Sequence, residues 1–321
     1  MHILINNQKS LSFISLTILF IIKYYIYCFN LTIENIINME SILSLEKPCK
    51  NPDASSDFSN KSFLISPQNQ KMLLLCTFDI QGIYEHITRK DRREKFRNLV
   101  KAEAKLKQGR YIVRKIIGKG SFGSVVEALD ESTGILIAIK IVRLKPGFTI
   151  HTSNEVLNLK KLGQADQENS LFVKLLDYFE EYGYLCIVLE LLDKSLFEYI
   201  MEVKNLSLTE IIPLAQQLFK ALLVMQNLNI VHCDLKPENI MLKISEKKSI
   251  KIVDMGSSCE TGKNVFKFVQ SRFYRAPEVT LRLEYGQAID IWSTACILSE
   301  LYVGRPLFGS RSENSQMVFF T

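Results

Sequence analysis

The chain has 321 residues, of which 47% are hydrophobic and 23% charged, the balance of a globular protein. Its formal net charge of +6 is too small an excess to indicate nucleic-acid binding, so no specific nucleic-acid partner is expected. The seven cysteines form no Cys-x-x-Cys pair and have no histidine at metal-ligand spacing, which argues against a zinc site and favours the reduced thiols of a cytoplasmic or nuclear protein.

The first distinct segment is the uncharged apolar run Leu11–Ile22, which lies between Lys9 and Lys23. Its twelve residues are short for a membrane-spanning helix, which needs about 20, and fit the core of a signal sequence better. If Lys23 reaches the interface, residues 11–29 could form a strained membrane anchor. The alternative is translated non-coding sequence, because the region is unusually rich in Ile, Asn, Tyr, Phe and Lys. Membrane contact is therefore the minority interpretation.

Two further segments precede the first predicted strand. Residues 51–69 are rich in Ser, Asp, Asn and Pro without an apolar period, which predicts a linker. Residues 88–107 form a basic stretch with helical character, interpreted either as a nuclear import patch or as a solvated helix. Residues 1–109 are thus interpreted as an N-terminal extension of a domain that spans residues 110–321.

A glycine-rich segment with the pattern GxGxxGxV follows, between Ile117 and Val126. Apolar alternation on both sides predicts a β-hairpin rather than a strand running into a helix, so a dinucleotide-binding turn is disfavoured. Glycine lets backbone N–H groups approach phosphate because it has no Cβ. The candidate contacts are Gly118, Lys119, Gly120, Ser121, Phe122 and Gly123 for the phosphates, with Val125 and Ala138 enclosing the base.

Lys140 lies near the end of the β-branched run Ile135–Val142, 22 residues after Gly118. An isolated strand lysine would be solvated, but the preceding glycine-rich segment indicates a lysine that anchors phosphate. Its expected partner is Glu155, on a following segment whose apolar residues recur at helical spacing. A plain surface carboxylate is the alternative for Glu155.

The apolar run Leu185–Leu192 predicts a buried strand that leads to the adenine position. Leu189 is expected to close the back of the pocket, and the backbones of Glu190 and Leu192 to face the base. Asp193 is a candidate ribose contact, and a turn-forming aspartate fits the position equally well.

The most informative string is HCDLKPEN, which begins at His232 and is followed by Asp254-Met-Gly. Asp234 is the candidate acceptor of a hydroxyl proton, and Lys236 can neutralise a γ-phosphate. Asn239 and Asp254 supply oxygen ligands for Mg²⁺. Phosphoryl transfer needs these residue types because its catalysis is mainly positioning and charge stabilisation.

Two signatures follow this string: Ala-Pro-Glu at residues 276–278, which ends an activation segment, and an apolar helix that begins at Asp290 and runs to about Val303. Five signatures in this order identify a protein kinase domain that uses ATP and Mg²⁺. Its predicted catalytic residues are Asp234, Lys236, Lys140 and Glu155.

The strings HCDLKPENI, SIKIVD, GSSC and QSRFYRAPE together resemble the DYRK family of kinases over roughly residues 110–317. Homeodomain-interacting kinases share much of the pattern. The resemblance implies a two-lobed α+β fold with an antiparallel β N-lobe, one regulatory helix and a mainly α C-lobe. It also implies protein substrates bearing Ser or Thr, often followed by Pro.

The chain departs from this family in its activation segment. The family carries Tyr-x-Tyr where this chain has Phe266 and Phe268, so no phosphate can form at either position. Arg272 and Arg275, which match the family's phosphotyrosine partners, therefore lack that partner. In one interpretation, packing of Phe268 holds the segment, and the two arginines bind Glu278, the substrate or another anion. In the other, the segment is poorly ordered and activity is low.

Two other departures concern the C-lobe. Met255 replaces the usual phenylalanine of Asp-Phe-Gly and is expected between His232 and Leu159, a tolerated change because methionine fills gaps adaptably. The kinase pattern stops at Thr321, which predicts a truncated C-lobe. An apolar patch is then expected on the helix 290–303, at Trp292, Ile297 and Leu301, and Glu278 is expected to lack its arginine partner.

Three hypotheses for the function follow. The chain is an active Ser/Thr kinase, a catalytically inactive scaffold with a kinase-like fold, or an unstable fragment. Retention of all six polar site residues favours the first over the second, because a scaffold does not need them. Those residues do not reject the third.

Overall fold

The computed structural model describes residues 89–120, 123–144, 149–168, 170–244, 246–262 and 268–309. The predicted anchor 11–29, the linker 51–69 and three candidate site residues, Ser121, Phe122 and Phe266, lie outside the described residues.

One half of the molecule is an antiparallel sheet with the strand order β1-β2-β3-β4-β6-β5. Its strands alternate buried and partly exposed residues or are rich in β-branched side chains, which is typical of strands in a sheet. The strands are β1 (Lys105–Leu106), β2 (Tyr111–Lys119), β3 (Gly123–Asp130), β4 (Ile135–Arg143), β5 (Leu175–Glu181) and β6 (Tyr184–Glu190).

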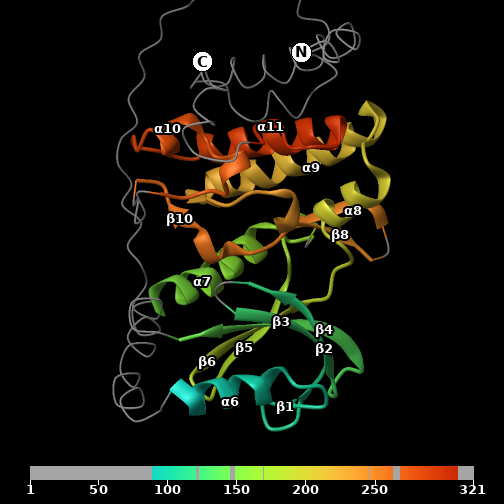
Figure 1. Cartoon of the computed structure of the whole chain (residues 1–321), viewed down its shortest axis with the longest axis vertical. Coiled ribbons are helices and arrows are strands. Elements are labelled where there is room, and N and C mark those ends of the chain that lie inside the picture. Colours follow the sequence, from blue (N-terminus) through green and yellow to red (C-terminus); the bar gives the residue numbers. More distant parts are fainter. Residues whose placement is uncertain are drawn as a thin grey trace, which may run out of the picture.

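The other half is mainly helical, and α7 (Thr149–Ala165) lies between it and the sheet (Figure 1). Its α-helices are α8 (Leu196–Val203), α9 (Leu208–Asn227), α10 (Pro277–Thr280) and α11 (Ala288–Val303). Its short strands pair as β7 (Ile230–Val231) with β10 (Cys259–Glu260), and as β8 (Ile240–Lys243) with β9 (Glu246–Ile252). The predicted α+β class with two lobes is confirmed.

Helices α8 and α9 begin with capping boxes. Ser195 and Ser207 are the N-caps, and the carboxylates of Glu198 and Glu210 accept hydrogen bonds from the backbone N–H groups of these serines. Helix α9 is long and apolar enough to cross a membrane by length and composition. Its apolar face is instead part of the core, which explains the composition without a membrane.

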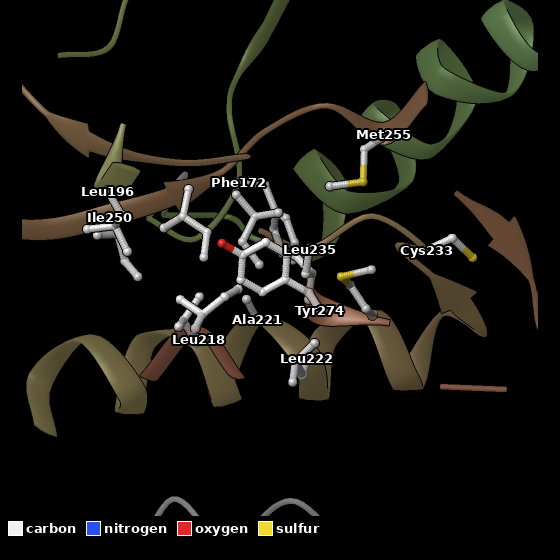
Figure 2. Packing of buried hydrophobic residues seen from close by; sticks show 14 of the residues in the cluster. Phe172, Leu196, Leu218, Ala221, Leu222, Cys233, Leu235, Ile250, Met255 and Tyr274 are labelled. Atoms are coloured by element: carbon white, nitrogen blue, oxygen red, sulfur yellow. The ribbon is translucent and has the colours of Figure 1, made fainter. Parts of the chain in front are cut away.

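The larger core joins the two halves. It contains Leu159 of α7, Leu185 of β6 and most buried residues of α9 and α11. In Figure 2 the ring of Tyr274 is surrounded by aliphatic side chains that include Leu218 and Leu235. Catalytic-loop and activation-segment residues thus share one packed cluster, so their backbones are held by the same core.

Helix α11 does not present the apolar patch predicted from the sequence. Trp292, Ile297 and Leu301 are all buried, with exposed fractions of 9%, 0% and 0%. The Trp292 ring is stacked on Phe308, with ring centres 5.6 Å apart, and helix α11 packs against α9 (Figure 1). The backbone of Leu206 also donates a hydrogen bond to the carbonyl of Leu301.

A smaller core lies on the opposite face of the sheet, under helix α6 (Arg89–Val100). Leu99 and Leu106 are 1% exposed and pack with Tyr111 and Tyr184. The helix ends at Val100, short of the predicted residue 107, because the chain turns back there and β1 pairs with β2. Helix α6 is therefore packed on the sheet and is not simply a solvated helix that precedes it.

Candidate active site

Three charged side chains from three elements meet where the two halves join. Lys140 of β4 places Nζ 2.6 Å from Glu155 Oε1 of α7 and 2.7 Å from Asp254 Oδ1, which follows β9. The predicted partner of Lys140 is therefore in contact with it. Glu155 is 3% exposed, which rules out the alternative of a surface carboxylate.

The pKa values of this cluster depend on burial and on the charges of the neighbouring members. Burial opposes the charge of Lys140, but the Glu155 and Asp254 carboxylates outweigh it and raise the pKa of Lys140. Burial also opposes ionisation of Asp254, yet the Lys140 charge outweighs it and lowers the pKa of Asp254 to about 2. Asp254 is consequently a carboxylate at neutral pH, the form that binds a hard cation.

The catalytic-loop string places its polar groups around Asp234. Lys236 Nζ donates to Asp234 Oδ2 at 2.7 Å and to Ser271 Oγ at 3.2 Å. Ser271 donates to Asp234 Oδ1 from its hydroxyl at 2.8 Å and its backbone N–H at 3.0 Å. Asn239 Nδ2 donates to the Asp234 carbonyl at 2.8 Å, which fixes its amide beside the loop. Asp234 thus already accepts a hydroxyl hydrogen bond, as a general base must.

The backbone of this loop is fixed by a buried carboxylate on α11. Asp290 accepts hydrogen bonds from the N–H of His232 at 2.6 Å and of Cys233 at 3.1 Å. Burial raises the pKa of Asp290 to about 6, while these two N–H groups favour its ionised form. Helix α11 thereby positions the residue before Asp234.

The glycine-rich hairpin forms as predicted, with β2 and β3 antiparallel across it. A side chain at Gly123 would place Cβ 2.0 Å from the Ile141 carbonyl oxygen, so this position requires glycine. Gly118 and Lys119 are the last two residues of β2 and Gly120 follows them, while Val125 and Ala138 face the larger core.

The predicted hinge begins at Glu190, the last residue of β6, and its polar side chains have different partners. The Glu190 side chain is turned to Lys251 and to the backbone of Lys174. The Asp193 side chain is exposed, and its backbone N–H donates to the Leu242 carbonyl. Leu189 and Leu192 pack against the larger core. Which groups contact adenine or ribose stays a prediction.

The activation segment favours the first of the two arrangements left open by the sequence. The Arg275 guanidinium lies 3.9 Å from the centre of the Phe268 ring. Its Nε donates to the Val269 and Gln270 carbonyls at 3.1 and 3.2 Å, and Nη2 donates to Gln270 O at 2.9 Å. Arg272 is exposed. Arg275 is therefore bound by backbone oxygens and a ring.

Glu278 does not receive either arginine. No basic side chain within the described ranges forms an ion pair with its carboxylate, and burial raises its pKa. Met255 is fully buried in the cluster that contains Leu159, as expected for a core position. Its placement directly between Leu159 and His232 stays a prediction.

Sequence reasoning gave no role to three residues of the site: Gln270, Ser271 and Asp290. Gln270 has φ of 65° and donates from its side chain to Ile289 O at 2.9 Å and Ser293 Oγ at 2.8 Å. Its carbonyl oxygen Oε1 accepts from Ala276 N–H at 2.9 Å. Ser271 follows it and reaches Asp234. Gln270 and Ser271 lie in a loop without periodicity, and the only signal for them was the string QSRFYRAPE that carries the family resemblance.

Comparisons with known proteins agree with this geometry. The family described as "Protein kinase domain" matches residues 111–320. The chain is 45% identical over 211 residues to serine/threonine-protein kinase ppk5 of Schizosaccharomyces pombe, covering 65% of this chain and 25% of that protein. It is 44% identical over 211 residues to dual specificity tyrosine-phosphorylation-regulated kinase 2 of Drosophila melanogaster, covering 65% and 29%. It is 41% identical over 211 residues to DYRK-family kinase pom1 of S. pombe, covering 65% and 19%. The chain thus spans less than a third of each relative.

Proposed function

The chain belongs to the protein kinase family, and from this we propose that it transfers the γ-phosphate of ATP to serine and threonine hydroxyl groups of proteins. The observation that carries the proposal is the double contact of Lys140, at 2.6 Å to Glu155 and 2.7 Å to Asp254. It joins the sheet, the helix α7 and the metal-ligand position in one arrangement, as phosphoryl transfer requires.

The polar groups fit Mg²⁺ and ATP by their chemistry. Asp254 is ionised at neutral pH, and the Asn239 side chain adds an amide oxygen, so two oxygen donors of the type that Mg²⁺ prefers stand beside the catalytic loop. When bound, MgATP supplies the phosphoryl group and neutralises part of its charge. Lys140 would bind the phosphates, while Glu155 keeps Lys140 in place.

Asp234 would accept the substrate hydroxyl hydrogen bond and orient its oxygen. Lys236, 2.7 Å from Asp234, adds positive charge where negative charge develops on the transferred group. Ser271 donates two hydrogen bonds to the other carboxylate oxygen of Asp234, which restricts rotation of the carboxylate.

Asp234→Asn tests this assignment in the 321-residue chain. We expect phosphoryl transfer to a serine peptide to fall by about 10³-fold or more, because the amide cannot act as base. Binding of a fluorescent ATP analogue should change by less than about threefold, since Asp234 does not carry the nucleotide. Turnover within tenfold of the unchanged chain would contradict the role of Asp234.

For the substrate, we propose a serine or threonine followed by proline. Gln270 O already accepts two N–H groups of Arg275, so it has little capacity left for an N–H of an incoming chain. Gln270 directly precedes Ser271, which donates to Asp234, and we therefore propose that the Gln270 carbonyl would face the residue after the acceptor hydroxyl. Proline has no N–H to leave unsatisfied there.

Matched peptides that differ only in the residue after the acceptor test this preference. A Ser-Pro peptide should give a higher kcat/KM than the Ser-Ala peptide by about tenfold, the usual effect of one unsatisfied buried N–H. A Tyr-Pro peptide serves to measure tyrosine transfer. Equal rates for the first two peptides would refute the proline preference and leave serine transfer intact.

We also propose a cytoplasmic or nuclear location. The four cysteines among the described residues, Cys186, Cys233, Cys259 and Cys296, are free and buried, as expected for a reducing compartment. Fluorescence microscopy of the tagged full chain would test it, and enrichment of the chain in membranes would contradict it.

A further inference from the structure

Lys251 is a buried lysine with no role in the phosphate-binding cluster. It lies in β9, three residues before Asp254, and its side chain is 4% exposed. Its ammonium group forms an ion pair with the carboxylate of Glu190, the last residue of β6. The two residues are 61 positions apart in sequence. The pair therefore connects the end of the sheet with the helical half.

Glu190 is also held from a second direction. Its Oε1 accepts the backbone N–H of Lys174 at 2.6 Å, and its own N–H donates to the Lys174 carbonyl at 3.1 Å. The carboxylate thus takes one hydrogen bond from the segment before β5 and one charge from β9. A carboxylate with two such donors has little rotational freedom.

The strand that carries Lys251 is tied to the same segment. Ile252 N–H donates to the Leu171 carbonyl at 2.9 Å, and Val173 N–H donates to the Ile252 carbonyl at 3.0 Å. Two residues after Ile252, Asp254 reaches Lys140 at 2.7 Å. Lys251 thus stands between the hinge at Glu190 and the phosphate-binding end of the site.

We propose that Lys251 is a positioning residue for nucleotide binding, which acts through Glu190 to fix the hinge relative to the Asp254 strand. The inference rests on the proposed function, because it assigns a role in the same ATP site. A buried ion pair can often be replaced as a whole by well-packed uncharged residues without loss of stability, whereas removal of one partner is costly. We therefore expect the Lys251–Glu190 pair to act by fixing geometry, so that its removal changes nucleotide affinity more than folding stability.

The test removes both charges together, because a single substitution would leave the other charge buried and unpaired. The double variant Lys251→Met with Glu190→Gln keeps side-chain volume at both positions. We expect its Kd for a fluorescent ATP analogue to rise about threefold to tenfold, the range for loss of one well-formed positioning contact. The KM for the peptide should stay within about twofold, since the peptide does not meet this pair.

Two comparison variants separate positioning from general stability. Lys251→Arg keeps the charge and should retain nucleotide affinity. The double variant Arg114→Met with Glu103→Gln removes a surface pair whose atoms are 2.9 Å apart in the N-lobe, and it should leave the Kd unchanged. Thermal unfolding of each variant shows whether a change in affinity merely follows a change in the folded fraction.

An unchanged or tighter Kd in the Lys251–Glu190 double variant would overturn the proposal, as would a loss explained by unfolding. The binding assay needs no turnover, so the two proposals fail separately. If the unchanged chain binds nucleotide without transferring phosphate, the proposed function fails while the role of Lys251 is still decided. If it binds no nucleotide, both fail.

Discussion

Arg275 is 7% exposed, and its guanidinium contacts the Phe268 ring and donates hydrogen bonds to the Val269 and Gln270 carbonyls. We expect Phe268→Leu to lower the free energy of unfolding by about 0.5–1 kcal/mol, the usual value of a cation–π contact at an exposed site. Phe268 is 45% exposed, which places it in that range. Phe268→Tyr should cost less, because tyrosine keeps the ring face.

Chemical denaturation in a double-mutant cycle with Arg275→Met measures this contact. If Phe268→Leu costs the same with and without the guanidinium, the ring does not stabilise Arg275. Phosphopeptide mapping of the Phe268→Tyr variant additionally shows whether the new hydroxyl becomes phosphorylated.

Asp290 gives the site a dependence on pH. Its pKa is about 6 in the folded chain, and an exposed aspartate in the unfolded chain has a pKa of about 3.9. The folded state therefore binds more protons between these values, so the contribution of Asp290 to stability falls as pH rises from about 4 to about 6 and is constant above. The change amounts to about 2–3 kcal/mol.

Asp290→Asn should remove this dependence. We expect the stability of the variant relative to the unchanged chain to increase by that amount between pH 4 and pH 6, measured by urea unfolding at each pH. The exposed Asp193→Asn variant is the control and should follow the unchanged chain. A stability difference for Asp290→Asn that is the same at every pH would contradict the raised pKa.

At the scale of elements, α11 depends on how it ends. Gly304 is its C-cap, with φ of 79°, and its N–H donates to the Glu300 carbonyl at 2.8 Å. A Cβ there would lie 2.4 Å from the backbone oxygen of Lys204, directly after α8. We expect Gly304→Ala to lower the free energy of unfolding by about 1–3 kcal/mol, from the left-handed backbone and the clash together.

Gly286→Ala is the matched control. It lies just before the same helix, has no left-handed φ, and its added Cβ would meet nothing within 4 Å. Its effect should be within about 1 kcal/mol of zero and of stabilising sign, through the unfolded chain. Similar losses of unfolding free energy in the two alanine variants would contradict the requirement for glycine at position 304.

Most elements around the site could be predicted from the sequence because their patterns are local. The hairpin of β2 and β3, the lysine strand β4 and the apolar helix α11 each have a run of residues that determines them. The Lys140–Glu155 contact could be predicted because the glycine-rich segment and the amphipathic pattern of the following helix identify both residues. The Glu190–Lys251 pair could not be predicted, because its residues are far apart in the chain and no motif spacing links them.

At the scale of the whole molecule, the sequence did not predict the second core. It is built from α6, the strands β1 to β4 and the strand β6, so its members come from distant parts of the chain. The same limit explains the error about α11, whose side chains are covered by residues that no periodicity pairs with it. Local pattern predicts which face is apolar, and only the tertiary structure shows what packs on it.

Leu99 tests whether α6 is part of the folded unit. It is 1% exposed in the smaller core, and the nearby Phe96 ring lies 5.4 Å from that of Tyr184. We expect Leu99→Ala to lower the free energy of unfolding by about 2–4 kcal/mol, because a buried leucine leaves a cavity when it is truncated. The neighbouring Asn98 is exposed, so Asn98→Ala should cost less than about 0.5 kcal/mol. Both are measured by urea unfolding of the full chain, followed by tyrosine fluorescence. If Leu99→Ala matched Asn98→Ala, the helix would be peripheral and the folded unit would begin at the sheet.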